Sequence, residues 1–151
     1  MSKHLLLGLG MALLLGTACG KKEELFGGSS GSSALTRVSD ITTADDRTAL
    51  VGRKITLNRV EATDVVGDVV FWVGEPNNTV PVVLGSELRD RGEEGDINIR
   101  RGNHYRISGV VRLVENVDRN DATWRLVDDR EMDAISAARV YIETSSVELE
   151  R

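Results

Sequence analysis

The chain of 151 residues contains one cysteine, two prolines and two histidines. One cysteine cannot form an internal disulfide, so a hydrophobic core has to hold the fold together. The histidines are His4 and His104, and neither belongs to a His or Cys cluster with the spacing of a zinc site. We therefore expect no metal site and no bound cofactor.

Aromatic residues and positive charge are also scarce. Phe, Trp and Tyr together make up 4% of the chain, and its formal net charge is −5 at pH 7. A mildly acidic domain lacks the broad positive field on which nucleic-acid binding relies. We therefore expect no nucleic-acid partner.

Motifs of common catalytic sites are scarce as well. The Gly-x-Ser-x-Gly sequence at residues 27–31 lies in a run of Gly and Ser outside any expected strand, and no glycine-rich phosphate loop is present. The acidic stretch 118–121 lacks the spacing and the distal glutamate of an EF-hand loop. We expect a protein that is not an enzyme and has no catalytic residues.

The most apolar run of the chain stands at its beginning. Lys3 precedes the apolar residues Leu5–Leu15, and small residues then lead to Cys19. This order of a basic, an apolar and a small-residue region is that of an export signal. The run from Leu5 to Ala18 is 14 residues long, shorter than the roughly 20 residues of a membrane-spanning helix.

This stretch resembles a bacterial lipoprotein signal peptide that ends in a lipobox. Gly16-Thr17-Ala18-Cys19 matches the motif at its last three positions and departs at the first, where leucine is commonest. The resemblance implies that residues 1–18 are a cleaved signal peptide and that Cys19 is the lipidation site. A membrane-spanning segment and an ordinary secretory signal are the alternatives.

A lipid on Cys19 would determine where the protein resides. Two acyl chains are enough for stable anchoring in a membrane. In Gram-negative lipoproteins an aspartate after the cysteine tends to retain the protein in the inner membrane, but Gly20 stands here. The resemblance therefore implies the cell envelope, and the periplasmic face of the outer membrane in a Gram-negative organism.

The residues after the signal divide into a tether and a domain. Residues 19–37 should form the lipidated cysteine and a flexible tether, because residues 27–33 consist only of Gly and Ser. Residues 38–151 should form one folded domain, since their number is sufficient to bury a core.

Hydrophobic alternation in this domain predicts β-strands. The first strand changes phase near Val60, which indicates a β-bulge. Gly109, in the middle of the fourth strand, indicates a sharp bend or a close backbone approach. The expected strands cover 54–66, 69–73, 79–84, 105–114 and 140–149.

Other patterns predict short helices. Residues 42–52 should form one or two helical turns, and a short turn is possible at 86–89. Asp128-Asp129-Arg130-Glu131 is similar to a capping box and should begin a helix. Residues 124–127 should form a brief extended piece.

The segments 67–74, 80–84, 101–111 and 140–144 resemble those of an OB-fold. In that family the fourth strand carries two glycines, and Gly102 and Gly109 fit this pattern. We therefore expect an all-β domain with one or two short helices, built as a small five-stranded OB-like antiparallel barrel. The usual helix between strands three and four is displaced to the interval between strands four and five. A six-stranded barrel and a β-sandwich are the alternatives.

The resemblance also implies a binding face. OB-folds bind ligands over strands two and three, often with aromatic side chains as stacking platforms. In this chain Trp72, Val83, Arg112 and Trp124 would contribute to such a face. Alternatively, Trp72 and Trp124 pack beneath helices.

The resulting hypothesis is a membrane-anchored envelope lipoprotein with a non-enzymatic OB-like binding or scaffolding domain. Besides the membrane itself, which it contacts through Cys19, its expected partner is an envelope protein or a saccharide. One alternative is a periplasmic OB domain that binds an oligosaccharide or an oligonucleotide, and an acidic aromatic groove would favour it. A small envelope hydrolase is another alternative, and a buried Ser, His or Asp cluster would favour it.

Overall fold

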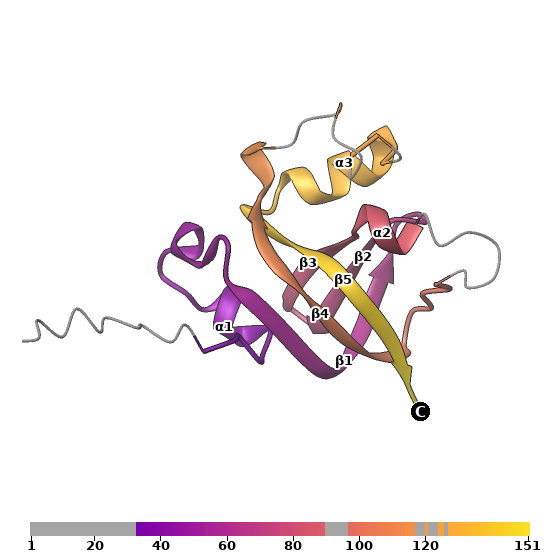
Figure 1. Cartoon of the computed structure of the whole chain (residues 1–151), viewed down its shortest axis with the longest axis horizontal. Helices are drawn as coiled ribbons and strands as arrows, with labels where there is room; N and C mark the ends of the chain where they lie inside the picture. Colours follow the sequence, from indigo (N-terminus) through magenta and orange to yellow (C-terminus); the bar gives the residue numbers. More distant parts are fainter. Residues whose placement is uncertain (1–32, 90–96, 117–119, 121–123, 126) are drawn as a thin grey trace, which may run out of the picture. The chain divides into compact units, whose positions relative to one another are not determined.

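A computed structural model of the chain describes residues 33–89, 97–116, 120, 124–125 and 127–151. Five strands form a closed barrel in the order β1-β2-β3-β5-β4 (Figure 1). This confirms the expected OB-like all-β fold, whereas the expected signal peptide and Cys19 lie outside the described residues. The strands are β1 Lys54–Val65, β2 Val70–Glu75, β3 Asn78–Leu84, β4 His104–Leu113 and β5 Val140–Glu150.

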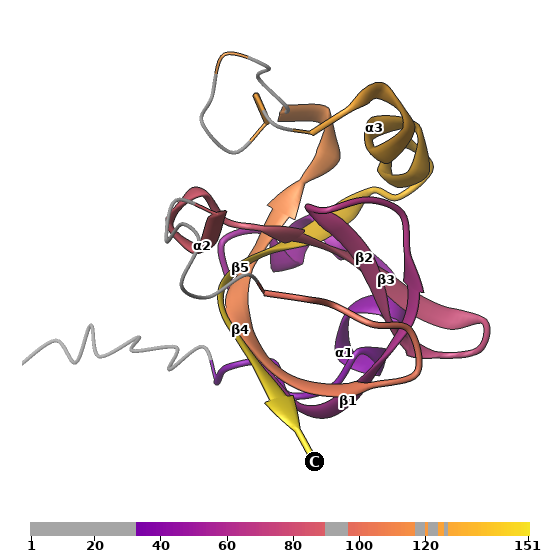
Figure 2. The same cartoon turned by 90° about the vertical axis from the view of Figure 1, so that its right-hand side faces the viewer.

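One strand contact differs from the antiparallel barrel that we expected. Residues 82–84 of β3 run parallel to residues 142–144 of β5, whereas every other neighbouring pair of strands is antiparallel. A closed ring of five strands cannot alternate in direction all the way round, because five is an odd number. One parallel pair is therefore required, and Figure 2 shows the ring along the barrel.

The β-bulge predicted from the phase change is present in β1. The register with β4 shifts between Leu57 and Val60, and Arg59 within this shift has a φ of 51°. A second shift follows between Ala62 and Asp64, where β1 pairs with β2. These irregularities let one strand pair with β4 in its first part and with β2 in its last part.

Of the two features expected at Gly109, a sharp bend or a close backbone approach, the close approach is present. The register between β4 and β5 shifts between Ser108 and Gly109. A Cβ atom at Gly109 would collide with the main-chain oxygen of Glu143 on β5. Glycine is needed here because the two backbones approach each other closely.

The barrel interior is filled by apolar side chains that alternate along the strands. The segment before the first helix adds to this core, because Leu35 and Val38 are 6% and 8% exposed. The Leu35 main chain also bonds to β1 on both sides of Ile55. Packing of the domain therefore begins ahead of residue 38. The fully buried large side chains of the strands include Ile55, Leu57, Phe71, Val73, Val82, Ile107, Val111 and Ile142.

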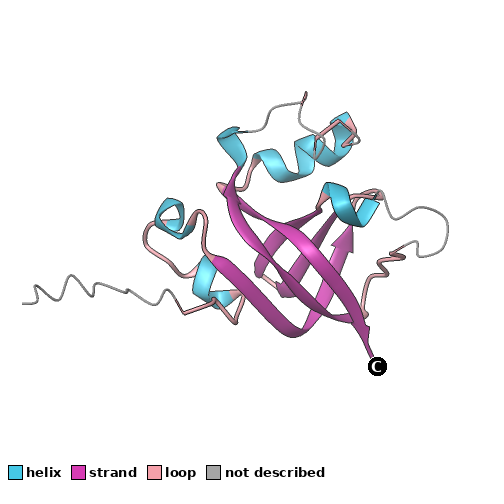
Figure 3. Ribbon diagram, viewed as in Figure 1, coloured by secondary structure: helices cyan, strands magenta, loops and turns pink. Residues whose placement is uncertain are grey.

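The helices are short, as Figure 3 shows. The segment 42–52, predicted as one or two turns, contributes to two separate elements, and the Asp46 side chain caps the second. Within the described residues, no helix has the length and apolar character required to cross a bilayer. The helices are α1 Ser39–Thr42, η1 Arg47–Leu50, α2 Ser86–Arg89, η3 Val114–Asn116 and α3 Asp129–Ser136.

The predicted capping box begins α3. Asp128 Oδ1 accepts a hydrogen bond from Glu131 N at 2.7 Å, and Glu131 Oε2 accepts one from Asp128 N at 3.0 Å. Glu131 is buried, and its Oε1 also accepts hydrogen bonds from Val69 N at 2.9 Å and Val70 N at 3.2 Å. One carboxylate thus caps its own helix and ties it to the beginning of β2.

Candidate functional site

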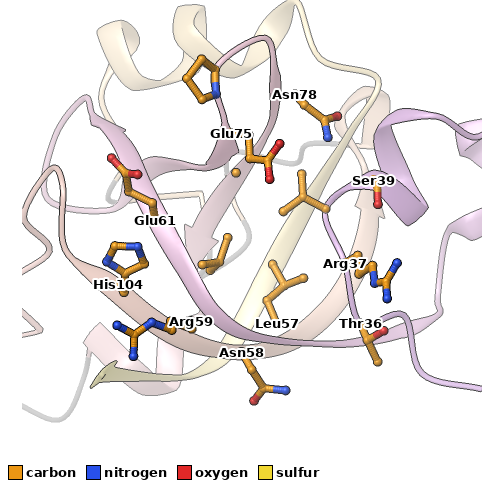
Figure 4. Close-up of a pocket in the computed structure, with 14 residues that line it drawn as sticks. Thr36, Arg37, Ser39, Leu57, Asn58, Arg59, Glu61, Glu75, Asn78 and His104 are labelled. Carbon is orange, nitrogen blue, oxygen red and sulfur yellow. The ribbon is translucent and has the colours of Figure 1, made fainter. Parts of the chain in front are cut away.

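A pocket of about 570 Å³ opens beside the β-bulge of β1. It lies between the first part of β1, the hairpin that joins β2 to β3, and the segment that leads into α1 (Figure 4). Its lining residues are Thr36, Arg37, Val38, Ser39, Leu57, Asn58, Arg59, Val60, Glu61, Gly74, Glu75, Pro76, Asn78 and His104.

The β2–β3 hairpin forms one wall of the pocket, and its turn depends on the backbone conformations of Gly74 and Asn77. Gly74 has a φ of 134°, and a Cβ atom there would collide with the main-chain oxygen of Asn78. Asn77 has a φ of 68° at the tip of the turn, a conformation that asparagine tolerates well. The Thr42 hydroxyl donates a hydrogen bond to Asn78 Oδ1, which links this hairpin to α1.

The segment before α1 forms a second wall. Asp40 Oδ2 accepts hydrogen bonds from Thr36 N at 3.0 Å and from Arg37 N at 2.9 Å. This carboxylate turns the chain away from β1 and positions Arg37 at the pocket. Buried Val38 and Leu57 supply an apolar lining.

Charged side chains of both signs surround this apolar lining. Figure 4 shows Arg59, Glu61 and His104 on one side of the pocket and Arg37 on the other. Arg37, Arg59, Glu61 and Glu75 are exposed, and the salt bridges found among the described residues involve none of them. The pocket therefore offers fixed charges of both signs that a ligand can pair with.

The structure separates the four residues of the predicted binding face into two groups. Trp72 is partly exposed, and the Arg112 side chain is 48% exposed and bonded through Nε to Glu143 Oε2 at 2.6 Å. Val83 is 0% exposed and Trp124 is 4% exposed. The four residues thus do not form one accessible surface, although strand register places Trp72 and Val83 on the same side of the β2–β3 ladder.

Trp124 packs against another aromatic ring. Its ring centroid lies 5.1 Å from that of Tyr141, and the two planes are inclined at 80°. This edge-to-face pair is a stabilising arrangement of aromatic side chains. Trp124 thus contributes to packing around β5.

None of the residues lining the pocket belongs to the predicted face. The pocket combines four segments that are far apart in the sequence, and no local motif joins them. The phase change in β1 was a local signal for its position, since the bulged residues Asn58 and Arg59 both line it. Among the described residues, no group of three or more His, Cys, Asp or Glu is arranged to hold a metal ion.

No family model matches the chain, and no curated protein matches it. Solved structures match it at low identity. Asparaginyl-tRNA synthetase from Pyrococcus horikoshii is 18% identical, with a TM-score of 0.42, over 68% of this chain and 21% of that chain. The chain therefore spans about a fifth of the length of that synthetase.

Two further matches cover more of the other chain. The hypothetical protein ygiW from E. coli is 16% identical, with a TM-score of 0.43, over 79% of this chain and 92% of that chain. The Stn1-ten1 complex from S. pombe is 11% identical, with a TM-score of 0.42, over 78% of this chain and 76% of the matched chain.

These matches correct one expectation. The acidic net charge predicted that nucleic acid is not a partner, but the matched structures include a synthetase that by its name acts on tRNA. The exclusion of nucleic acid therefore does not hold.

Proposed function

We propose that the protein is a cell-envelope lipoprotein whose OB-like barrel acts as a binding module without catalytic activity. Lipid on Cys19 anchors the chain, and the ligand occupies the pocket beside the β-bulge of β1. The observation that carries this proposal is the pocket itself. It combines a buried apolar lining with four exposed charged side chains that form no salt bridge with a described residue.

The pocket has the properties that ligand sites commonly share. Such sites measure roughly 300–1,000 Å³ and combine an apolar lining with a few polar groups that orient the ligand. Here the apolar part includes Leu57 and Val38, and the polar part includes Arg37 and Arg59. The guanidinium groups carry a permanent positive charge and can each form paired hydrogen bonds to a carboxylate or phosphate.

The proposed anchor places this module at a membrane surface. The lipobox-like residues 16–19 support lipidation, and Gly20 supports the periplasmic face of the outer membrane in a Gram-negative organism. Only 13 residues separate Cys19 from Ser33, the first described residue. The proposed ligand site would therefore remain close to the membrane.

Mass spectrometry of the mature N-terminus tests the anchor. The native chain should begin at Cys19 and carry the mass of a diacylglyceryl group, usually with a further acyl chain on the amine. The Cys19→Ser variant should lack this mass and partition away from membranes. An unmodified Cys19 in the native protein, or a mature chain that begins elsewhere, would refute the anchor.

Site-specific photo-crosslinking in living cells tests the pocket. A photoreactive residue at Glu75, on the hairpin wall, should give an adduct that is absent when the same residue is placed at exposed Arg139, which does not line the pocket. Protease, nuclease and glycosidase digestion then identify the class of the adduct. Equal adducts at both positions, or none at Glu75, would count against a pocket ligand.

A further inference from the structure

The part of β1 that lines the pocket has an open strand edge. On the side away from β4, β1 bridges to Leu35 at Ile55 and pairs with β2 only from Ala62 onward. Between these two contacts, residues 57–61 have no strand partner on that side among the described residues. All five of them line the pocket.

The bridge between Leu35 and Ile55 shows which main-chain N–H and C=O groups of β1 face the open side. Thr56 N–H donates to Leu35 O at 2.9 Å, on the side of β1 away from β4. Main-chain groups alternate between the two sides of a strand, so those of Asn58 face the same side as those of Thr56. The Asn58 side chain accepts a hydrogen bond from Arg106 Nε at 3.1 Å, so it is already partnered on β4.

The chain itself already places one residue, Leu35, against this edge. Leu35 forms a parallel bridge with Ile55, and Asp40 then turns the chain away by binding the main chain of Thr36 and Arg37. The open edge at 57–61 directly continues the edge that Leu35 occupies. It therefore continues the edge at which the chain already forms one parallel bridge.

We propose that the ligand of this pocket is an extended polypeptide segment that adds to the edge of β1 at residues 57–61. This inference rests on the proposed function and names its ligand class. A polypeptide is favoured because its own N–H and C=O groups can pair with those on the open side of β1, as in other complexes formed by strand addition. By alternation these belong to Asn58 before the bulge and to Glu61 after it, since Thr56 bonds to Leu35 and Ala62 bonds to Asn103 on the opposite side. Five extended residues would span about 16 Å, and the bulge at Arg59 makes residues 57–61 of β1 shorter than that, which suits a peptide of about four extended residues.

The lining of the pocket also indicates the side chains of this peptide. In an extended peptide, alternate side chains face opposite sides. One set would contact the apolar lining at Leu57 and Val38, and the other would face the charged rim. Arg59 on the edge itself and Arg37 on the opposite side of the pocket can both pair with a carboxylate, so we assign an acidic residue to the set that faces the rim.

Binding of defined peptides to the full chain carrying Cys19→Ser tests the proposal. The probe is a fluorescein-labelled acetyl-Ser-Val-Glu-Val-Glu-Val-Ser-amide, measured by fluorescence anisotropy. N-methylation of one alternate set of its amides should weaken binding at least tenfold, whereas N-methylation of the other set should have a much smaller effect. This comparison needs no change in the protein, so it does not depend on whether a variant folds.

Protein variants test the role of the arginines. Arg37→Gln and Arg59→Gln should each weaken binding of the acidic peptide severalfold, and Arg139→Gln, which removes an exposed charge outside the pocket, should not. A matched peptide with lysine in place of glutamate should bind at least tenfold more weakly. Equal binding of the two peptides would overturn the assignment of an acidic residue.

Other outcomes would overturn strand addition itself. Equal loss of binding for both N-methylated sets, or no peptide binding while an oligothymidylate or a glycan oligomer binds, would refute a polypeptide strand. In the crosslinking experiment, an adduct at Glu75 that is sensitive to nuclease or glycosidase would refute the peptide but retain the pocket as a binding site. Absence of any adduct specific to Glu75 would instead count against the proposed function.

Discussion

Gly67 lies directly against the buried carboxylate of Glu131, and no space for a Cβ atom remains between them. The same carboxylate accepts hydrogen bonds from the main chain at Val69 and Val70. The turn before β2 and helix α3 are therefore fitted to each other through one glycine and one glutamate.

Substitution of Gly67 should reduce stability through steric conflict. Gly67→Ala places a methyl group on the Glu131 carboxylate, and relief of this contact would disturb the hydrogen bonds to β2. We expect the free energy of unfolding to fall by about 1–3 kcal/mol, the usual cost of overpacking. Chemical denaturation measures it, with Asp68→Ala at the neighbouring exposed position as the control. A Gly67→Ala protein as stable as that control would contradict the fit.

Position 59 should tolerate glycine, because the backbone of Arg59 is left-handed. Its φ of 51° lies in the left-handed region, which glycine adopts readily and β-branched residues avoid. Arg59→Gly should therefore keep the stability of the native chain, whereas Arg59→Val should lower the free energy of unfolding by about 1–2 kcal/mol. Thermal melts of the two variants compare them directly. Equal melting temperatures would show that the bulge relaxes.

Removal of the segment before α1 should destabilise the barrel. A chain that begins at Val38 lacks Leu35, which is buried and bonded through its main chain to β1. We expect it to be less stable than a chain beginning at Ser33 by about 2–5 kcal/mol, the cost of removing a large core side chain. Denaturant melts of both chains measure the difference. A difference below about 0.5 kcal/mol would show that the segment is only a spacer.

Phe71 and Trp72 should differ in their contribution to stability. Phe71 is 1% exposed inside the barrel, whereas Trp72 is partly exposed on the outer side of the same strand. Phe71→Ala should cost about 3–5 kcal/mol, as cavity-forming changes do. Trp72→Ala should cost clearly less. Comparable large losses would mean that Trp72 is needed for packing and would end its role in a binding face.

Asp46 should make stability depend on pH at acidic values. Its pKa lies below the ordinary value of 3.8, because the Thr48 hydroxyl donates a hydrogen bond to it at 2.6 Å and Thr48 N donates another at 2.9 Å. A lowered pKa in the folded state stabilises the fold above the unfolded-state pKa, and this contribution is lost as the pH falls through the folded-state pKa.

We therefore expect Asp46→Ala to be less stable than the native chain at pH 7 and the difference to narrow below about pH 3.8. Urea denaturation at a series of pH values measures it. Asp45→Ala removes an exposed neighbouring carboxylate and serves as the control. A difference that stays constant from pH 7 to pH 2 would contradict the assignment.

Local sequence patterns were sufficient to predict much of the barrel. The phase change around Val60 indicated the bulge, Gly109 indicated the close approach to β5, and Asp128 with Glu131 indicated the beginning of α3. Each of these features depends on residues that are close together along the chain, or on a single residue with a particular backbone requirement. Such requirements can be recognised before any tertiary contact is known.

The candidate site could not be predicted in this way. Its walls come from residues 36–39, 57–61, 74–78 and 104, which only the closed barrel brings together. The burial of Val83 and Trp124, two residues of the predicted face, also follows from the folded chain and from no local pattern. The additional bonds of Glu131 to β2 likewise depend on tertiary structure and have no local pattern.

The lengths of the strand ladders have a consequence for local unfolding. The β2–β3 hairpin is joined to the rest of the barrel by two short ladders. Strand β2 pairs with residues 62–65 of β1, and residues 82–84 of β3 pair with β5. By contrast, β4 pairs with β5 over the whole of residues 104–113. Cooperative opening begins where few bonds cross between units. In hydrogen-exchange measurements, the amides at the flanks of the hairpin should therefore exchange before those of the β4–β5 ladder. The hairpin is also one wall of the pocket, so transient opening of these short ladders would admit a ligand larger than the resting pocket without unfolding the barrel.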